Sequence, residues 1–177
     1  IISGASDFTS NITGLQPGIK YYVRAYAKNS VGVAYGDELS FTTPALTPSV
    51  TTTAITDITL NSAKSGGNIT TDGGAPVTER GVCWSKSPNP TASGDCTSDG
   101  QGTGSFTSNI TDLDPGTKYY VRAYAKNTSG TGYGEELSFT TDQVLFPSVT
   151  TSQISSVGVT TAVAGGNVTS DGGGTIL

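Results

Sequence analysis

Apolar and polar side chains alternate along the stretch TKYYVRAYAKN at residues 117–127. Successive side chains of an extended strand point to opposite sides, so this stretch has two faces. One face carries Tyr119, Val121, Ala123 and Ala125, and the other carries Tyr120, Arg122, Tyr124 and Lys126. We expect the first set to face a second sheet and the second set to face water, its aliphatic stems covering the outside of the sheet.

The rest of residues 48–142 contains further strand-like segments separated by turn residues. DGG at 72–74, DPG at 114–116 and SG at 129–130 supply the Gly and Pro that turns need for positive or fixed φ. The pattern predicts seven short strands, at residues 48–54, 59–72, 77–85, 95–98, 104–110, 117–127 and 132–141. A bulge is expected at Gly66–Gly67. The predicted fold class is all-β, a sandwich of two sheets.

The same pattern recurs along the chain. Tyr21 matches Tyr119 at a shift of 98 residues, and PSVTT at 48–52 matches 147–151 at a shift of 99. The extra residue falls between Thr141 and Pro147, which marks a linker. We therefore expect one complete domain at 48–142, the C-terminal half of a domain at 1–43 and the N-terminal part of another at 146–177. Neither partial unit has a counterpart of residues 79–98, as expected for a window of a longer tandem array.

Composition excludes several classes of partner. Hydrophobic residues make up 34% of the chain and charged residues 13%, a profile that favours strands over helices. The net charge is −5, and nine Lys and Arg are spread along the chain, which argues against nucleic acid as a partner. No apolar run has the length of a membrane span.

An enzyme is not expected. The chain has no His, so a Ser-His or Cys-His relay is excluded. The carboxylates at Asp72, Asp99, Asp114, Glu135 and Glu136 fall in predicted turns or at a strand start. We interpret them as turn-capping groups, with a glycosidase pair as the formal alternative. No cofactor is predicted.

The two cysteines, Cys83 and Cys96, are thirteen residues apart. Alternation with Val82 and Trp84 places Cys83 on the outward side of its strand. We predict a cross-strand disulfide between them, with two free thiols as the alternative. A zinc site is not expected because there is no second pair of ligands. Calcium is not expected either, since neither Asp72 nor the loop at 95–99 belongs to a D-x-D-x-D-G series.

The stretch LDPGTKYYVRAYAKNTSG at 113–130 resembles the second-half signature of fibronectin type III domains. The residues that match in order are Leu113, Pro115, Gly116, Thr117, Tyr119, Val121, Ala123, Asn127 and Gly130. The resemblance implies tandem seven-stranded fibronectin type III-like (Ig-like) sandwiches, in which Tyr119 and Tyr21 hydrogen-bond to upstream backbone. The family's core Trp usually lies on the second strand, whereas Trp84 lies on the third, so the core is expected to be rebuilt around Trp84.

The outward tyrosines form a candidate binding face. Tyr120 and Tyr124 flank Arg122, and the first unit repeats them as Tyr22, Arg24 and Tyr26. Exposed aromatic rings can stack on sugars or contact a protein. The alternative interpretation is a cross-strand Tyr-Arg ladder that stiffens the sheet.

Several asparagines stand in Asn-x-Ser/Thr sequences, which accept glycans in a eukaryotic secretory context. They are Asn11, Asn68, Asn109, Asn127 and Asn167. In a chain so rich in Thr, many such matches arise by chance.

The repeats also resemble those of secreted surface proteins of Bacteroidetes-type bacteria, which implies an extracellular or cell-surface location. The main hypothesis is a structural repeat of a surface stalk, fibre or filament that acts as a spacer or adhesin shaft, with Pro44 and Pro48 limiting bending of the linker. One alternative is a carbohydrate- or protein-binding accessory module of a secreted enzyme. Another is a filament subunit that assembles with identical subunits by strand complementation. The expected partners are neighbouring repeats, identical subunits, or surface glycans and proteins.

Overall fold

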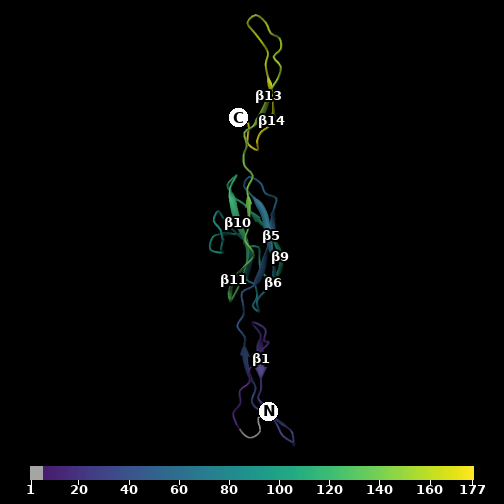
Figure 1. Cartoon of the computed structure of the whole chain (residues 1–177), viewed down its shortest axis with the longest axis vertical. Coiled ribbons are helices and arrows are strands. Elements are labelled where there is room, and N and C mark those ends of the chain that lie inside the picture. Colours follow the sequence, from purple (N-terminus) through teal and green to yellow (C-terminus); the bar gives the residue numbers. More distant parts are fainter. Residues whose placement is uncertain (1–5) are drawn as a thin grey trace.

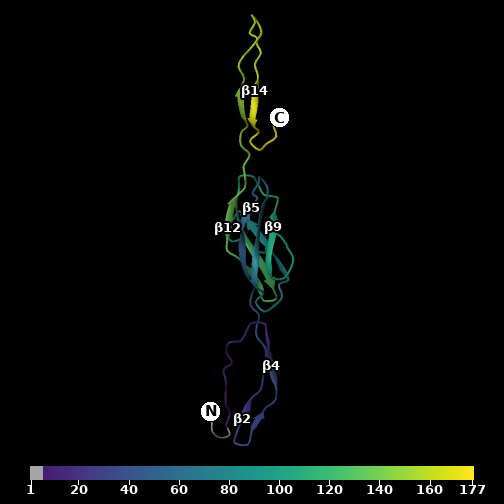
Figure 2. The same cartoon turned by 90° about the vertical axis from the view of Figure 1, so that its right-hand side faces the viewer.

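Three parts of the chain lie end to end in the computed structural model, which describes residues 6–177 (Figures 1 and 2). We call residues 6–43 the N-terminal unit, 48–142 the central domain and 146–177 the C-terminal unit. The two outer units lie at opposite ends of the central domain, so the molecule is long and narrow.

The central domain is a sandwich of two antiparallel sheets. The first sheet has the order β5-β6-β9, with β5 at Ser49–Thr56, β6 at Ala63–Thr71 and β9 at Gly104–Ile110. The second has the order β11-β10-β7-β8, and β12 also pairs with β10. Its strands are β7 (Glu79–Ser85), β8 (Asp95–Cys96), β10 (Lys118–Asn127), β11 (Gly130–Tyr133) and β12 (Leu137–Thr140). The predicted fold class, an all-β sandwich, is confirmed.

The inward face of β10 supplies much of the core. Tyr119, Val121, Ala123 and Ala125 are all buried, as their alternation predicts. They pack against residues of the opposite sheet that include Ile69, Phe106 and Ile110. Trp84 only packs against the edge of this cluster and remains partly exposed, so the prediction of a core built around Trp84 is wrong. Branched aliphatic side chains fill the centre instead, and the largest fully buried ones are Ile69, Ile110, Val82 and Val121.

Gly67 lets the two sheets approach closely. A Cβ atom at this position would lie 2.7 Å from the Cβ of Ala123 and 2.8 Å from the Thr51 carbonyl oxygen. The β5–β6 register does shift nearby, between Thr53 and Thr56. The extra residue of this shift lies on β5, while Gly66 and Gly67 pair in regular register, so the bulge predicted at these glycines is wrong. Gly67 instead has a packing role.

The last predicted strand is two strands in the structure. β11 pairs with β10 as far as Tyr124↔Tyr133, and β12 begins its pairing with β10 at Val121↔Leu137. Between these pairs, three residues (134–136) lie opposite two residues of β10 (122–123), so there is one extra residue. The Thr52 hydroxyl from β5 enters this gap, where it accepts a hydrogen bond from the Ala123 amide (3.0 Å) and donates one to the Glu135 carbonyl (2.6 Å). A side chain from the other sheet thus replaces a backbone partner, which local sequence did not reveal.

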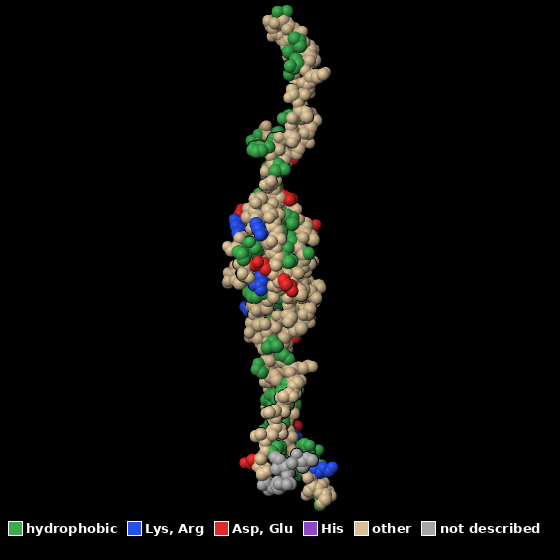
Figure 3. Space-filling view, in the orientation of Figure 1, with side chains coloured by type: hydrophobic (Ala, Val, Ile, Leu, Met, Phe, Trp, Pro, Cys, Tyr) green, Lys and Arg blue, Asp and Glu red, His purple; other side chains and the backbone are tan. Residues whose placement is uncertain are grey.

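The outer units contain only separate two-stranded sheets within the described residues. The N-terminal unit pairs β1 (Lys20–Val23) with β4 (Leu39–Thr42), and β2 (Tyr26–Lys28) with β3 (Val33–Tyr35). The C-terminal unit pairs β13 (Ser148–Thr151) with β14 (Gly166–Ser170). Many of their apolar side chains lie at the surface (Figure 3). Val168 is 50% exposed, whereas its counterpart Ile69 is 2% exposed.

Candidate functional sites: the outer sheet face and the joints

A ladder of cations and aromatic rings covers the outer face of β10. Lys118 Nζ lies 4.9 Å from the centre of the Tyr120 ring, and the Arg122 guanidinium carbon lies 4.6 Å from that of Tyr133. Arg122 Nε also donates to the Gly134 carbonyl at 3.1 Å. Tyr120 and Arg122 are partly exposed.

Tyr124 does not belong to an exposed face, and this part of the predicted binding face is wrong. It is 2% exposed, and its single O–H lies within hydrogen-bond distance of two acceptors, Glu79 Oε1 (3.0 Å) and the Thr97 carbonyl oxygen (2.9 Å). The segment after β8 runs along β7 and covers this side of the sheet, with the Thr97 amide bonded to the Val82 carbonyl. Burial, and next the hydrogen bond to Glu79, raise the pKa of the Tyr124 phenol well above its ordinary value.

The N-terminal unit repeats the ladder without that cover. Lys20 lies 5.0 Å from the ring centre of Tyr22, and Arg24 lies 5.0 Å from that of Tyr35. Tyr26, the counterpart of Tyr124, is 65% exposed. In both units a cation already occupies one face of each ladder ring, and that ring face is closed to a stacked sugar. The arrangement therefore matches the stiffening ladder better than a sugar-binding platform.

The disulfide Cys83–Cys96 is present, which confirms that prediction. The two residues are directly opposite each other in the β7–β8 register. Cys83 is fully buried although its side of the sheet faces away from the core, and its bond partner Cys96 lies on the neighbouring strand β8. The loop between these strands returns to the sheet, where the Ala92 amide donates to the Tyr133 hydroxyl at 2.9 Å.

Carboxylates serve local hydrogen bonds. Asp99 accepts from the hydroxyls of Thr97 (2.6 Å) and Ser108, which links the β8 side of one sheet to β9 of the other. Lys86 bonds to Asp114, which lowers the pKa of the Asp114 carboxyl and raises that of the Lys86 ammonium. Within residues 6–177 no group of three or more metal-ligating side chains was found.

The two predicted corner tyrosines bond to upstream backbone. The Tyr119 hydroxyl accepts from the Asp114 amide at 3.0 Å, and the Tyr21 hydroxyl accepts from the Gln16 amide at 2.8 Å. Each ring stacks on a cross-strand Phe, with 5.9 Å between the ring centres in both units. The corner therefore has the same geometry in both repeats.

Asn127 holds the linker that enters the central domain. Its Nδ2 donates to the carbonyl oxygens of Leu46 and Asp72, each at 2.7 Å, and its Oδ1 accepts from the Ser129 amide. The side chain is 4% exposed. A glycan on Nδ2 would replace one of the two donated hydrogens at a buried side chain, so Asn127 is wrong as a predicted acceptor. Asn68 is half-buried, while Asn11, Asn109 and Asn167 are exposed.

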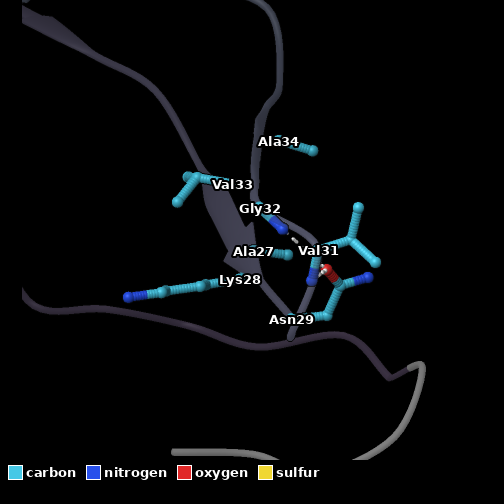
Figure 4. A pocket seen from close by; sticks show the side chains of 7 residues that line it. All are labelled: Ala27, Lys28, Asn29, Val31, Gly32, Val33 and Ala34. Carbon is cyan, nitrogen blue, oxygen red and sulfur yellow. Dashed lines mark hydrogen bonds between the residues drawn. The ribbon is translucent and has the colours of Figure 1, made fainter.

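The remaining surface offers shallow features. Figure 4 shows an open hollow at the β2–β3 turn, lined by Ala27, Lys28, Asn29, Val31, Gly32, Val33 and Ala34. Asn29 Oδ1 accepts from the amides of Val31 and Gly32 there, so the polar group is used to close the turn. Residues 6–177 contain no helix that is long and apolar enough to cross a membrane.

No protein-family model matches the sequence, and no curated protein matches it. Among solved structures, the chain is similar to domains d3–d4 of the rat CD45 extracellular region, with a TM-score of 0.58 and 18% identity over 80% of this chain and 72% of that one. It is also similar to the chicken CNTN1 FN1–FN3 domains (TM-score 0.46, 15% identity, 73% of this chain and 45% of that one). A further similar structure is the sixth fibronectin type III domain of human fibronectin type III domain containing protein 3 (TM-score 0.40, 24% identity, 59% of this chain and 89% of that one).

The likeness to rat CD45 concerns the fold alone. Together with the strand order of the two sheets, it defines the class of the central domain, an all-β sandwich of the fibronectin type III-like and Ig-like kind.

Proposed function

We propose that this chain is a structural repeat of an extracellular stalk or fibre, and that it acts as a spacer. The observation that carries the proposal is the end-to-end order of the three parts, with the outer units at opposite ends of the central domain (Figure 1). Such an order converts added repeats into added length.

Two features support the extracellular part of the proposal. The Cys83–Cys96 disulfide suits an oxidising environment. The similar rat CD45 domains come from an extracellular region. We extend the proposal to secreted bacterial surface proteins on the resemblance of the repeats, and we take 1–43, 48–142 and 146–177 as the repeat boundaries.

Small-angle X-ray scattering of the full chain at several concentrations tests the spacer role. The expected result is a pair-distance distribution with the long tail of a rod and a mass independent of concentration. A compact, single-lobed distribution would contradict the proposal.

Strand complementation between copies is the second candidate, because β1 pairs only with β4 within the described residues and Leu39 is 69% exposed. A mass that rises with concentration in the same scattering series would favour it over the spacer role.

A further inference from the structure

At the first joint, between the N-terminal unit and the central domain, Pro44, Ala45 and Leu46 each hydrogen-bond to one of the two flanking parts. On one side, the Pro44 carbonyl accepts from the Gly18 amide of the N-terminal unit at 3.3 Å. On the other, the Ala45 carbonyl accepts from the Ser129 hydroxyl of the central domain at 2.8 Å. Two consecutive residues are thus bound to different parts. The Leu46 amide then donates to the Gly73 carbonyl at 2.8 Å, and Asn127 binds the Leu46 carbonyl.

The two parts also touch directly, turn against turn. A Cβ atom on Gly74 would lie 2.2 Å from the Pro17 carbonyl oxygen, and one on Gly18 would lie 1.9 Å from the Gly74 carbonyl oxygen. Real Cβ atoms do not approach backbone so closely, so this contact requires glycine at both positions. The joint is closed by backbone packing as well as by hydrogen bonds.

The second joint, between the central domain and the C-terminal unit, uses equivalent backbone hydrogen bonds but lacks the turn-against-turn contact. The Asp142 carbonyl accepts from the Gly116 amide (2.8 Å), and the Leu145 amide donates to the Gly172 carbonyl (2.7 Å). Gln143 and Val144 lie between these attachment points, both exposed, where the first joint has only Ala45. Gly173, the counterpart of Gly74, would have no atom within 4 Å of an added Cβ.

We propose that the two joints differ in stiffness, and that the single extra residue at 142–146 is the cause. The first joint is a rigid coupling, and the second is a pliable one. The inference rests on the proposed spacer function and deepens it: the spacer is an articulated rod whose bending points are set by linker length. A linker with one residue between its two attachment points, itself hydrogen-bonded, has fewer accessible conformations than a linker with two exposed residues there.

Matched glycine substitutions in the full chain test this difference. Gly74→Ala and Gly173→Ala introduce the same side chain at φ of +87° and +80°, so their intrinsic backbone strain is alike. Only Gly74→Ala also breaks a contact between parts. The readout is amide hydrogen exchange by NMR at Gly18 and at its counterpart Gly116, whose amides bond to the linkers. We expect Gly74→Ala to accelerate exchange at Gly18 by about tenfold, as loss of roughly one hydrogen bond would, and Gly173→Ala to leave Gly116 unchanged. Equal responses would overturn the inference.

A second variant keeps the test decisive if Gly74→Ala does not fold. Inserting one glutamine between Pro44 and Ala45 copies the spacing of the second linker. Scattering from this variant is expected to show a broader range of end-to-end distances than the unaltered chain, and an unchanged distribution would overturn the inference. If the unaltered chain itself is not rod-like, the spacer proposal fails. If it is rod-like and the variants behave alike, only the articulated rod fails.

Discussion

Asn127 acts as a connector because its amide group faces three backbone groups at once. Its Nδ2 has two carbonyl acceptors and its Oδ1 has one amide donor, all from different turns or linkers. A buried amide with these partners is satisfied, and few other side chains could supply two donors and an acceptor in that space. The residue therefore ties the linker, the β6–β7 turn and the β10–β11 turn together.

Replacement of Asn127 by Asp is expected to destabilise the central domain by about 2–4 kcal/mol, because a buried carboxylate oxygen would face two carbonyl oxygens. Urea unfolding followed by the fluorescence of Trp84, the single tryptophan, measures this. Asn109→Asp is the matched control, since it adds the same charge at an exposed position of the same domain and is expected to cost at most about 0.5 kcal/mol. Equal losses in the two variants would contradict the connector role.

At the scale of elements, the edge made by β7 and β8 decides which side chains of the outer face stay exposed. β8 has only two residues, yet the segment that follows it covers Tyr124. Such a short strand gains little from its own ladder bonds, and the Cys83–Cys96 bond holds it in place.

Removing this disulfide with the pair Cys83→Ala and Cys96→Ala is expected to lower the free energy of unfolding by about 2–3 kcal/mol, because the closed loop is short. The urea midpoint of the double variant should match that of the wild-type chain under reducing agent. A midpoint equal to that of the oxidised chain would show that the bond does not stabilise the fold.

Across the whole molecule, burial is concentrated in the central domain. Phe139 is 7% exposed there, while its counterpart Phe41 in the N-terminal unit is 38% exposed. Equivalent strands therefore have very different amounts of apolar contact. Local opening should be much easier in the outer units than in the centre.

Limited proteolysis with trypsin exposes this difference at matched sites. We expect cleavage after Lys20, Arg24 and Lys28 well before cleavage after their counterparts Lys118, Arg122 and Lys126, with the fragments identified by mass spectrometry. Each outer site and its counterpart have the same residue type and are exposed to the same protease in one reaction, so each central site is the internal control for its outer counterpart. Equal cleavage rates at the two sets would mean that the outer units are as well protected as the central domain.

The sequence by itself determined the features that depend on neighbours along the chain. The alternation at 117–127 placed Tyr119 and Val121 inside, and the predicted strand at 104–110 coincides with β9. Period-two alternation is a local property, and the positive φ of glycine at a turn such as Gly73–Gly74 is local too. The repeat likewise needed no structure, and it located the extra linker residue.

Only the tertiary structure decided the features that depend on segments far apart in the chain. Tyr124 has the same outward alternation as Tyr120, and it is buried because residues after β8 cross over it. The split between β11 and β12 depends on Thr52 from the opposite sheet. Asn127 resembled a glycan site until Leu46 and Asp72 filled its hydrogen bonds. A pattern along one strand cannot contain these contacts, because Leu46 and Asp72 are 55 or more residues from Asn127, and the partners of Thr52 are 71 and 83 residues away.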